Sequence, residues 1–357
     1  MNDETNIETP AIETQNPPKS GKMKRLKIAG VLLTVAGIAL FAYFVYSVGV
    51  GSILEGIKRI GFDGFAILMF LYFLRIVCRA YAWTLSVYEP YKLTVKDTLP
   101  AVIIGEALSS LIPLGILISG TSKAVAVRNR VPLVVGLSSI ATENLFYSLV
   151  TGLFIVFGAV AFLRSFELET GWIATIDVLI AIIFVLIIFA VVVVVKQWHF
   201  LSSICEWFYE RDIGKSIFEH GRMQVRLFEN LIYGFYRKYP KRFAPICLMQ
   251  LIFHALGVLE VWFILSRITN GNPDFFASFL LESMSRVITI VFKLVPFLIG
   301  VDEAGAQFVT ETLALGAGIG VTLAIIRKGR ILFWTATGLI LIAKRGLSIK
   351  ELAKSLK

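Results

Sequence analysis

The stretch VLIAIIFVLIIFAVVVVV, residues 178–195, decides the fold class, because eighteen successive apolar residues carry no charge. A helix needs about 20 such residues to cross a bilayer core about 30 Å thick. Apolar stretches recur from residue 28 to residue 343, and 57% of the 357 residues are hydrophobic while 17% are charged. The mean hydropathy is +0.77. We therefore expect an all-α, polytopic integral membrane helical bundle of about 6–8 transmembrane helices.

The charge balance is basic, with 35 Lys and Arg against 25 Asp and Glu. These basic residues cluster between the apolar stretches, which is typical of the positive-inside rule and of attraction to anionic lipid headgroups. We therefore expect no nucleic-acid partner. The three cysteines, Cys78, Cys205 and Cys247, form no CxxC pair. This spacing predicts neither a disulfide framework nor a metal site, and we expect no cofactor.

The basic residues also predict the orientation. We expect the protein to lie in the cell (inner) membrane. Four basic residues in KMKRLK (22–27) precede the first apolar run, 28–48, so we expect the N-terminus to be cytoplasmic. The basic C-terminal tail belongs on the same side. The expected parts are a disordered tail at 1–22, a membrane domain at 23–345 that includes a cytoplasmic amphipathic loop at 196–242, and a basic tail at 346–357.

Residues 98–120, TLPAVIIGEALSSLIPLGILISG, have the length of one crossing but contain Glu106, Pro113 and Gly115. The basic segment 123–130 follows, so positive-inside logic places both flanks in the cytoplasm. One crossing cannot do that, whereas two half-helices that meet near Pro113 can. Such irregular backbone is tolerated at membrane depth where it lines a protein cavity. The pattern predicts a re-entrant hairpin.

The C-terminal part allows two topologies. Three apolar pieces, 275–300, 303–326 and 331–343, follow an external turn at 270–274. Either all three cross the membrane, or 275–320 forms a second re-entrant hairpin and one final helix crosses. The other expected crossings are 64–86, 132–163, 172–195 and 243–268.

The two Pro-broken regions share an order of residues. In the first, Glu106, Ser109 and Pro113 precede Gly120, Lys123 and Ala124; in the second, Glu282, Ser285 and Pro296 precede Gly300, Glu303 and Ala304. Further on, Gly136 precedes Glu143 by seven positions, as Gly320 precedes Arg327. The order predicts a weak inverted repeat with broken helices, an arrangement typical of alternating-access transporters. At two corresponding positions the charges are opposite: Lys123 corresponds to Glu303, and Glu143 to Arg327.

Charged residues inside the apolar regions are candidates for contact with a ligand, because each costs at least about 2.5–3.5 kcal/mol at a helix centre. The expected headgroup-binding residues are Arg75, Arg79, Glu106, Lys123, Glu143, Glu282, Glu303 and Arg327. The expected structural residues are Pro113, Gly120, Pro296, Gly300 and Asp302, the last as a helix cap. The alternative for each charge is a structural ion pair or snorkelling. We favour that alternative for Lys293 and Arg330, leave Glu260 open, and expect a local pair between Glu282 and Arg286.

Residues 295–339, VPFLIGVDEAGAQFVTETLALGAGIGVTLAIIRKGRILFWTATGL, resemble the C-terminal signature of the lysylphosphatidylglycerol synthase transmembrane-region family, the flippase-like domain. The matching residues are Pro296, Gly300, Glu303, Ala304, Gly316, Arg327 and Trp334. The N-terminal half departs from the family pattern, since Lys123 stands where an acid or Arg is expected and no Arg follows Glu143.

The resemblance implies a membrane domain that moves a lipid or lipid-linked intermediate with a charged headgroup between leaflets. The soluble synthase domain of bifunctional members is not expected here, so a cytoplasmic partner enzyme would make the substrate. Two other functions stay open: a non-transporting membrane subunit that binds a partner through 196–242, and an intramembrane lipid-modifying transferase. His199, His220 and His254 are scattered, so we expect no catalytic residue and favour a transport protein over an enzyme.

Overall fold

The computed structural model describes residues 39–344, and every regular element in the described residues is helical. The gaps are 40, 44, 112–114, 166–176, 179, 183, 186–187, 190–191, 194–195, 197, 212–224, 227–228, 231, 270–273, 293–294 and 317. Three described helices are long and apolar enough to cross a membrane, within Val50–Leu85, Leu133–Ser165 and Pro240–Ile268. The predicted all-α membrane bundle is confirmed. The tails at 1–22 and 346–357, most of the run 28–48, Pro113 and Lys293 lie outside the described residues.

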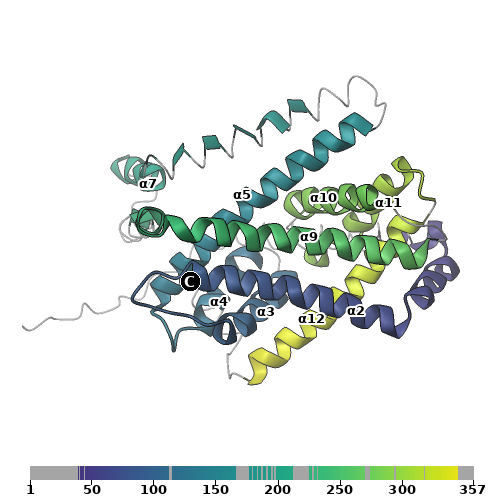
Figure 1. The fold of residues 1–357 in the computed structure, drawn as a ribbon, viewed down its shortest axis with the longest axis horizontal. Helices are drawn as coiled ribbons and strands as arrows, with labels where there is room; N and C mark the ends of the chain where they lie inside the picture. The colour runs from purple at the N-terminus through teal and green to yellow at the C-terminus, as the bar shows by residue number, and fades with distance from the viewer. Residues whose placement is uncertain are drawn as a thin grey trace, which may run out of the picture.

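Two long helices, α2 (Val50–Leu85) and α9 (Phe243–Ile268), lie side by side (Figure 1). Their ion pairs show that they run in opposite directions. Asp63 pairs with Arg267 at 3.1 Å and Arg75 with Glu260 at 3.0 Å, and just beyond the helix ends Glu89 pairs with Arg242 at 2.5 Å. Partner numbers on α9 therefore fall as those on α2 rise.

Two helical hairpins flank this pair. The first consists of α3 (Val95–Leu111) and α4 (Gly115–Ala126), the second of α10 (Phe275–Val291), η2 (Pro296–Leu298) and α11 (Val301–Thr312). In both hairpins a helix of 17 residues precedes one of 12. At a rise of 1.5 Å per residue these helices are about 25 and 18 Å long, less than a bilayer core of about 30 Å. Their lengths suit re-entrant hairpins better than full crossings.

The long helices α5 (Leu133–Ser165) and α12 (Ile319–Lys344) follow the two hairpins. We expected separate pieces at 303–326 and 331–343, and this prediction is wrong. The helix break lies between α11 and α12 instead, where Gly316 and Gly318 have φ of 116° and 80°. Only glycine adopts such values readily. The charged stretch at 327–330 stays helical because its arginines have buried partners, which are described below.

Another difference concerns the start of α2. The expected crossings at 28–48 and 64–86 leave residues 49–61 as a connection, but residues 50–60 already belong to the helix. The chain bends at Gly61, whose φ is 66°, and then continues as the expected crossing. The helix at 133–165 corresponds closely to the expected crossing 132–163, and α9 begins and ends where it was expected.

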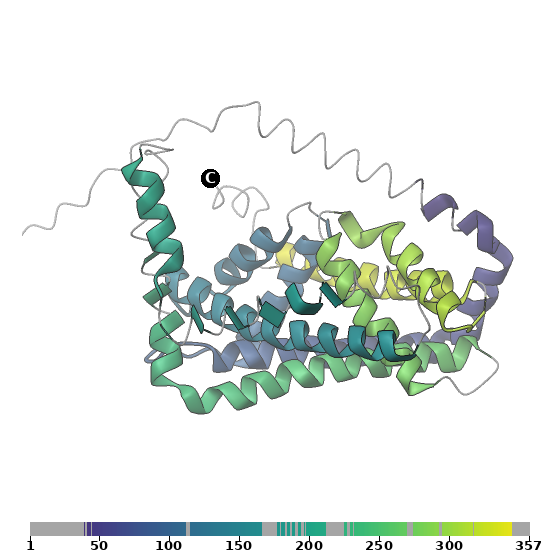
Figure 2. The ribbon, with the colours of Figure 1, turned by 90° about the horizontal axis from the view of Figure 1, so that it is seen from above.

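The inverted repeat is confirmed by helix lengths and packing. The order α2, α3, α4, α5 in the first half matches α9, α10, α11, α12 in the second: long, 17 residues, 12 residues, long. Interfaces also correspond, because α3 packs on α12 as α10 packs on α5, and α4 packs on α5 as α11 packs on α12. The antiparallel α2 and α9 pack on each other across the pseudo-twofold axis. Figure 2 shows α9, in green, along one edge of the bundle with the second hairpin beside it.

Small residues bring the two halves close at corresponding interfaces. A Cβ on Gly158 of α5 would overlap the side chain of Ser283 on α10. A Cβ on Gly338 of α12 would overlap the Cβ of Ala107 on α3. Helices in membranes often pack through such small residues, because van der Waals contact rather than hydrophobic burial drives their association.

The segment 196–242 contains helix α7 (Phe200–Glu210) and ends in the short η1 (Pro240–Arg242). Trp198 and Trp207 are exposed, and the guanidinium of Arg211 lies 3.9 Å from the ring centroid of Trp207. Aromatic and basic side chains of this kind suit a membrane surface. The cytoplasmic location of the segment stays a prediction.

Candidate functional site: a buried arginine cluster and its cavity

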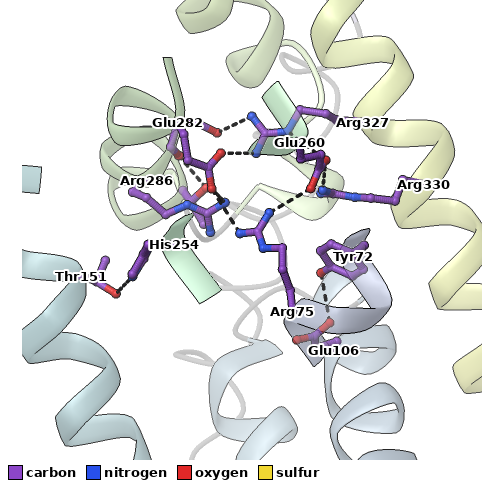
Figure 3. Close-up of polar contacts among 12 residues, drawn as sticks. Tyr72, Arg75, Glu106, Thr151, His254, Glu260, Glu282, Arg286, Arg327 and Arg330 are labelled. Carbon is purple, nitrogen blue, oxygen red and sulfur yellow. Dashed lines mark hydrogen bonds and ion pairs between the residues drawn. The ribbon is translucent and has the colours of Figure 1, made fainter. Parts of the chain in front are cut away.

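The centre of the bundle holds six charged side chains from four helices, which point toward one another in Figure 3. We call them the central network: Arg75 (α2), Glu260 (α9), Glu282 and Arg286 (α10), and Arg327 and Arg330 (α12). Helical spacing brings them to the bundle centre: Glu282 and Arg286 are four positions apart, and Arg327 and Arg330 are three. On α9 the buried residues Gln250, Phe253, Gly257 and Glu260 recur every three or four positions.

Glu282 is the most connected member of the central network. Its carboxylate accepts hydrogen bonds from Arg75 at 3.1 Å, Arg286 at 2.6 Å and Arg327 at 2.9 Å. Glu260 accepts from Arg75 at 3.0 Å and from Arg330. Both glutamate side chains have no exposed area, and Arg75 is 1% exposed. Charges so deep in a membrane protein are tolerated when they pair with one another.

Neighbouring residues leave room for the network and hold its arginines in place. A Cβ on Gly257 would lie 2.8 Å from Cδ of Glu282 and 3.1 Å from Cζ of Arg75, so only glycine fits without a shift. The guanidinium of Arg75 lies 4.4 Å from the ring centroid of Phe253, and that of Arg330 lies 4.0 Å from that of Tyr72. These cation–π contacts add attraction on the faces that the carboxylates leave free.

A cavity of about 210 Å³ lies beside the central network, where the two hairpins meet. Its walls include serine and threonine hydroxyls and aromatic rings. The charged side chains that line it are Arg75, Arg286, Arg327, Arg330, Glu106 and Asp302. The central network contains four guanidiniums and two carboxylates, so the cavity borders a centre with more positive than negative charge.

The two acids that line the cavity are only weakly neutralised. Glu106 accepts a hydrogen bond from the hydroxyl of Tyr72 at 3.0 Å, and no cation of the described residues lies within ion-pair distance of it. For Asp302 the nearest cation among the described residues is the ammonium of Lys328, at 3.9 Å. The cavity thus offers guanidinium donors together with two carboxylates that have no close ion pair among the described residues.

A second polar cluster lies in the other half of the repeat. Arg79 of α2 donates two hydrogen bonds to Glu143 of α5, at 3.1 and 3.0 Å, and a third to Asn144 at 3.1 Å. Gln250 also donates to Glu143, at 2.8 Å. None of these residues lines the large cavity. Of the expected headgroup-binding residues, Arg75, Glu106, Glu282 and Arg327 thus lie at the central network or its cavity, and Arg79 and Glu143 lie in the second polar cluster.

The two clusters correspond across the pseudo-twofold axis with their charges exchanged. A pair between α2 and α5, Arg79 with Glu143, corresponds to one between α9 and α12, Glu260 with Arg330. Arg330, and not Arg327 as the sequence suggested, is therefore the counterpart of Glu143. Neighbouring aromatic pairs also correspond: Tyr72 of α2 with Trp334 of α12 at 6.2 Å, and Phe253 of α9 with Tyr147 of α5 at 5.7 Å. The repeat therefore extends to the side chains of the site.

The acids at 302 and 303 have different roles from those expected. Glu303 accepts a hydrogen bond from the backbone N–H of Gly300 at 2.8 Å and completes the cap of α11, so the prediction that Asp302 is the cap is wrong. Glu303 also pairs with Lys328 at 2.5 Å and does not line the large cavity, whereas Asp302 does. The reason is position: with Gly300 as N-cap, residue 303 is the third helical residue, whose carboxylate reaches back to the N-cap.

The remaining expected residues are placed as follows. Lys123 is buried in α4, and its side chain packs against Gly105, where a Cβ would lie 2.6 Å from the lysine Cε. Gly120 lies inside α4, and a Cβ there would meet no atom within 4 Å, so packing gives no reason for a glycine. Pro296 begins η2, and Gly300, with φ of 81°, starts α11. Both stand at the break in the second hairpin.

Sequence reasoning left three network members out of the expected site. Arg286 was treated only as the local partner of Glu282, Arg330 was read as structural, and Glu260 was left open. Helical spacing from Glu282 and Arg327 could have found the two arginines. Among the described residues, no three His, Cys, Asp or Glu side chains gather as metal ligands.

Comparison with known proteins gives one match. A family model described as the lysylphosphatidylglycerol synthase TM region matches residues 27–339, which include both halves of the repeat and both polar clusters. Searches of curated proteins and of solved structures each returned no match. Since the match covers nearly the whole chain, this membrane protein belongs to the lysylphosphatidylglycerol synthase transmembrane-region family.

Proposed function

We propose that this protein moves a phospholipid or a lipid-linked intermediate with a charged headgroup between the leaflets of the cell membrane. One observation carries the proposal: a cavity of about 210 Å³, lined by four arginines, lies where two broken-helix hairpins meet. A headgroup cannot cross hydrocarbon without polar contacts, because each unsatisfied polar group there costs several kcal/mol. The cavity supplies such contacts.

The chemistry of the cavity suits a headgroup that contains phosphate. Guanidinium groups bind phosphate oxygens through two parallel hydrogen bonds, a geometry that lysine cannot offer. Glu106 lines the same cavity without a cation partner among the described residues, so it suits a positively charged part of a headgroup. Of the headgroup-binding residues expected from sequence, Arg75, Glu106 and Arg327 line this cavity.

The architecture supports transport over a purely structural role. In secondary transporters, inverted repeats with broken helices place the substrate site at the repeat interface, and rocking of the halves exposes it to each side in turn. Here the cavity is lined by residues of both hairpins, from α3 in the first half and from α10 and α11 in the second. The membrane topology proposed with this function has both termini in the cytoplasm.

The test is a reconstitution assay in liposomes. The purified protein is reconstituted with fluorescent phosphatidylglycerol, phosphatidylethanolamine or lysylphosphatidylglycerol, and membrane-impermeant dithionite reports which lipids reach the outer leaflet. The assay is run without a gradient and with imposed proton or sodium gradients. We expect headgroup movement above that of empty vesicles for at least one lipid.

A matched pair of variants controls the assay. Arg286→Gln alters an arginine of the cavity, whereas Arg267→Gln alters a solvent-facing arginine that pairs with Asp63 at 3.1 Å. We expect the first to slow movement and the second to leave it unchanged. Movement no faster than in empty vesicles, for all three lipids and all gradients, would contradict transport and favour a non-transporting subunit.

A further inference from the structure

We infer that Arg286, Arg330 and Trp334 form the phosphate-binding position of the cavity, and that Arg75 and Arg327 hold the surrounding scaffold. All five residues line the cavity. The inference deepens the proposed function and rests on it in one respect, namely that the phosphate belongs to a lipid. We call Arg286, Arg330 and Trp334 the phosphate seat.

Three buried hydrogen-bond donors of the phosphate seat have no acceptor in the described part of the chain. The Nε atoms of Arg286 and Arg330 and the indole Nε1 of Trp334 are buried, and none has an acceptor among the described residues. A buried donor without an acceptor is costly, so several at one cavity call for explanation. A ligand with several acceptor oxygens supplies one.

Both terminal nitrogens of each scaffold arginine donate hydrogen bonds to acceptors within the protein. Arg75 donates from Nη1 to Glu260 and from Nη2 to Glu282, although its Nε also lacks an acceptor. Arg327 donates from Nη1 to Ser285 at 3.1 Å and from Nη2 to Glu282 at 2.9 Å. Little donor capacity is left on either residue for a ligand.

The arginines of the phosphate seat are less committed. In the described part of the protein, Arg286 donates only from Nη2, to Glu282, and Arg330 only from Nη1, to Glu260. Each therefore keeps Nε and one terminal nitrogen for a ligand. Their positions are nonetheless fixed by these bonds, and that of Arg330 also by the face of Tyr72, 4.0 Å away. Such preorganised donors lose little freedom when a ligand binds.

Trp334 adds a neutral donor whose ring is held by packing alone. Its ring is stacked on Phe73 with centroids 6.0 Å apart and tilted against Tyr72 at 6.2 Å. These contacts use the ring, and Nε1 has no acceptor in the part of the chain that the structure describes. Phosphate is an acceptor-only group with several oxygens, so it matches two guanidiniums and an indole N–H together.

The surrounding charge favours an anion at the phosphate seat. Both arginines belong to the central network, where four guanidiniums face two carboxylates, and Glu106 lies apart from that network, bonded to Tyr72 (Figure 3). A phosphodiester would therefore settle toward the arginines, and any cationic part of the headgroup toward Glu106. The same donors would also bind free phosphate, so the experiment must distinguish a lipid phosphodiester from inorganic phosphate.

Binding to the full-length protein in detergent tests the phosphate seat without relying on transport. Isothermal titration calorimetry is run with three probes: dihexanoyl phosphatidylglycerol, inorganic phosphate and phosphate-free dihexanoylglycerol. We expect the phospholipid to bind more tightly than either of the others. Inorganic phosphate that binds as tightly would overturn the lipid source, and dihexanoylglycerol that binds as tightly would overturn the phosphate seat.

Conservative variants then identify the donors. Trp334→Phe removes Nε1 but keeps a ring, and Arg286→Lys and Arg330→Lys keep the charge but remove Nε. We expect each to weaken phospholipid binding about tenfold, the effect of losing a hydrogen bond to a charged group. The controls are Trp83→Phe, whose indole already donates to Ser139 at 2.8 Å, and Arg267→Lys, an exposed arginine that pairs with Asp63 at 3.1 Å, both with wild-type affinity.

The outcomes separate the phosphate seat from the proposed function. Trp334→Phe breaks no hydrogen bond within the described protein, so it remains informative even if Arg330→Lys fails to fold. Wild-type affinity in both Trp334→Phe and Arg286→Lys would overturn the phosphate seat, even with transport intact. Weakened binding in these variants, with no lipid movement by the wild type, would support the phosphate seat and contradict transport.

Discussion

Arg75 of α2 and Glu282 of α10 are joined by a 3.1 Å hydrogen bond, although they lie 207 positions apart in the chain. The bond connects the first half of the repeat to the second half, and Glu282 also binds Arg286 and Arg327. One buried carboxylate thus holds three arginines from three helices. Four predictions follow from this network and from the acids around it.

The first prediction concerns Glu282 itself. Glu282→Gln removes the charge that compensates three buried guanidiniums, so we expect a loss of stability of about 3–5 kcal/mol, typical of a broken buried ion pair. Thermal unfolding in detergent measures it. The control is Glu55→Gln, because Glu55 is exposed and pairs only with Arg59 one helical turn away; we expect a change below about 1 kcal/mol there. Equal shifts in the two variants would show that the network does not hold the bundle together.

The second prediction uses the space around Gly257. Gly257→Ala would place a Cβ 2.8 Å from Cδ of Glu282 and 3.1 Å from Cζ of Arg75, so the ion pair must shift. Overpacking of this kind costs about 1–3 kcal/mol. Gly120→Ala is the matched control, because a Cβ there meets no atom within 4 Å and alanine favours a helix by about 1 kcal/mol. The melting temperature should fall for Gly257→Ala and stay equal or rise for Gly120→Ala.

These features differ in how far the sequence could predict them. The spans of α5 and α9 were predicted closely because charged or polar segments bound a continuous apolar run at each end. The Glu282–Arg286 pair was predictable as well, since four positions on a helix bring side chains together. The bonds from Arg75 to Glu260 and Glu282 join residues 185 and 207 positions apart, and only tertiary packing decides such partners.

The exchange of roles between Asp302 and Glu303 was predictable in principle. The break at Gly300 was expected, and a cap at that residue places Glu303 third in the helix, the position that reaches back to the N-cap. The break at Gly316 and Gly318 was missed for another reason. The charges at 327–330 favoured a helix break there, whereas the break is made by glycines with positive φ within an apolar stretch.

The third prediction separates a structural from a functional role for Glu303. Glu303→Gln leaves Lys328 with only Asp302, 3.9 Å away, so the bundle should lose about 3–5 kcal/mol of stability. The double variant Glu303→Gln with Lys328→Met removes both charges and should recover most of that loss. Transport should recover with it. A double variant that is stable but inactive in the liposome assay would indicate that Glu303 binds the headgroup, as the sequence predicted.

The fourth prediction concerns Glu106, which lines the cavity and accepts one hydrogen bond, from Tyr72 at 3.0 Å. Glu106→Gln keeps an acceptor for that hydroxyl and breaks no ion pair among the described residues, so the melting temperature should change little. Under the proposed function, the carboxylate attracts the cationic part of a headgroup. We therefore expect movement of lysylphosphatidylglycerol to fall about tenfold relative to phosphatidylglycerol, the loss typical of one charged hydrogen bond. Tyr72→Phe removes the hydrogen bond but keeps the carboxylate, so its relative rates should stay as in the wild type. An unchanged ratio of the two rates in Glu106→Gln would show that this carboxylate does not select the headgroup.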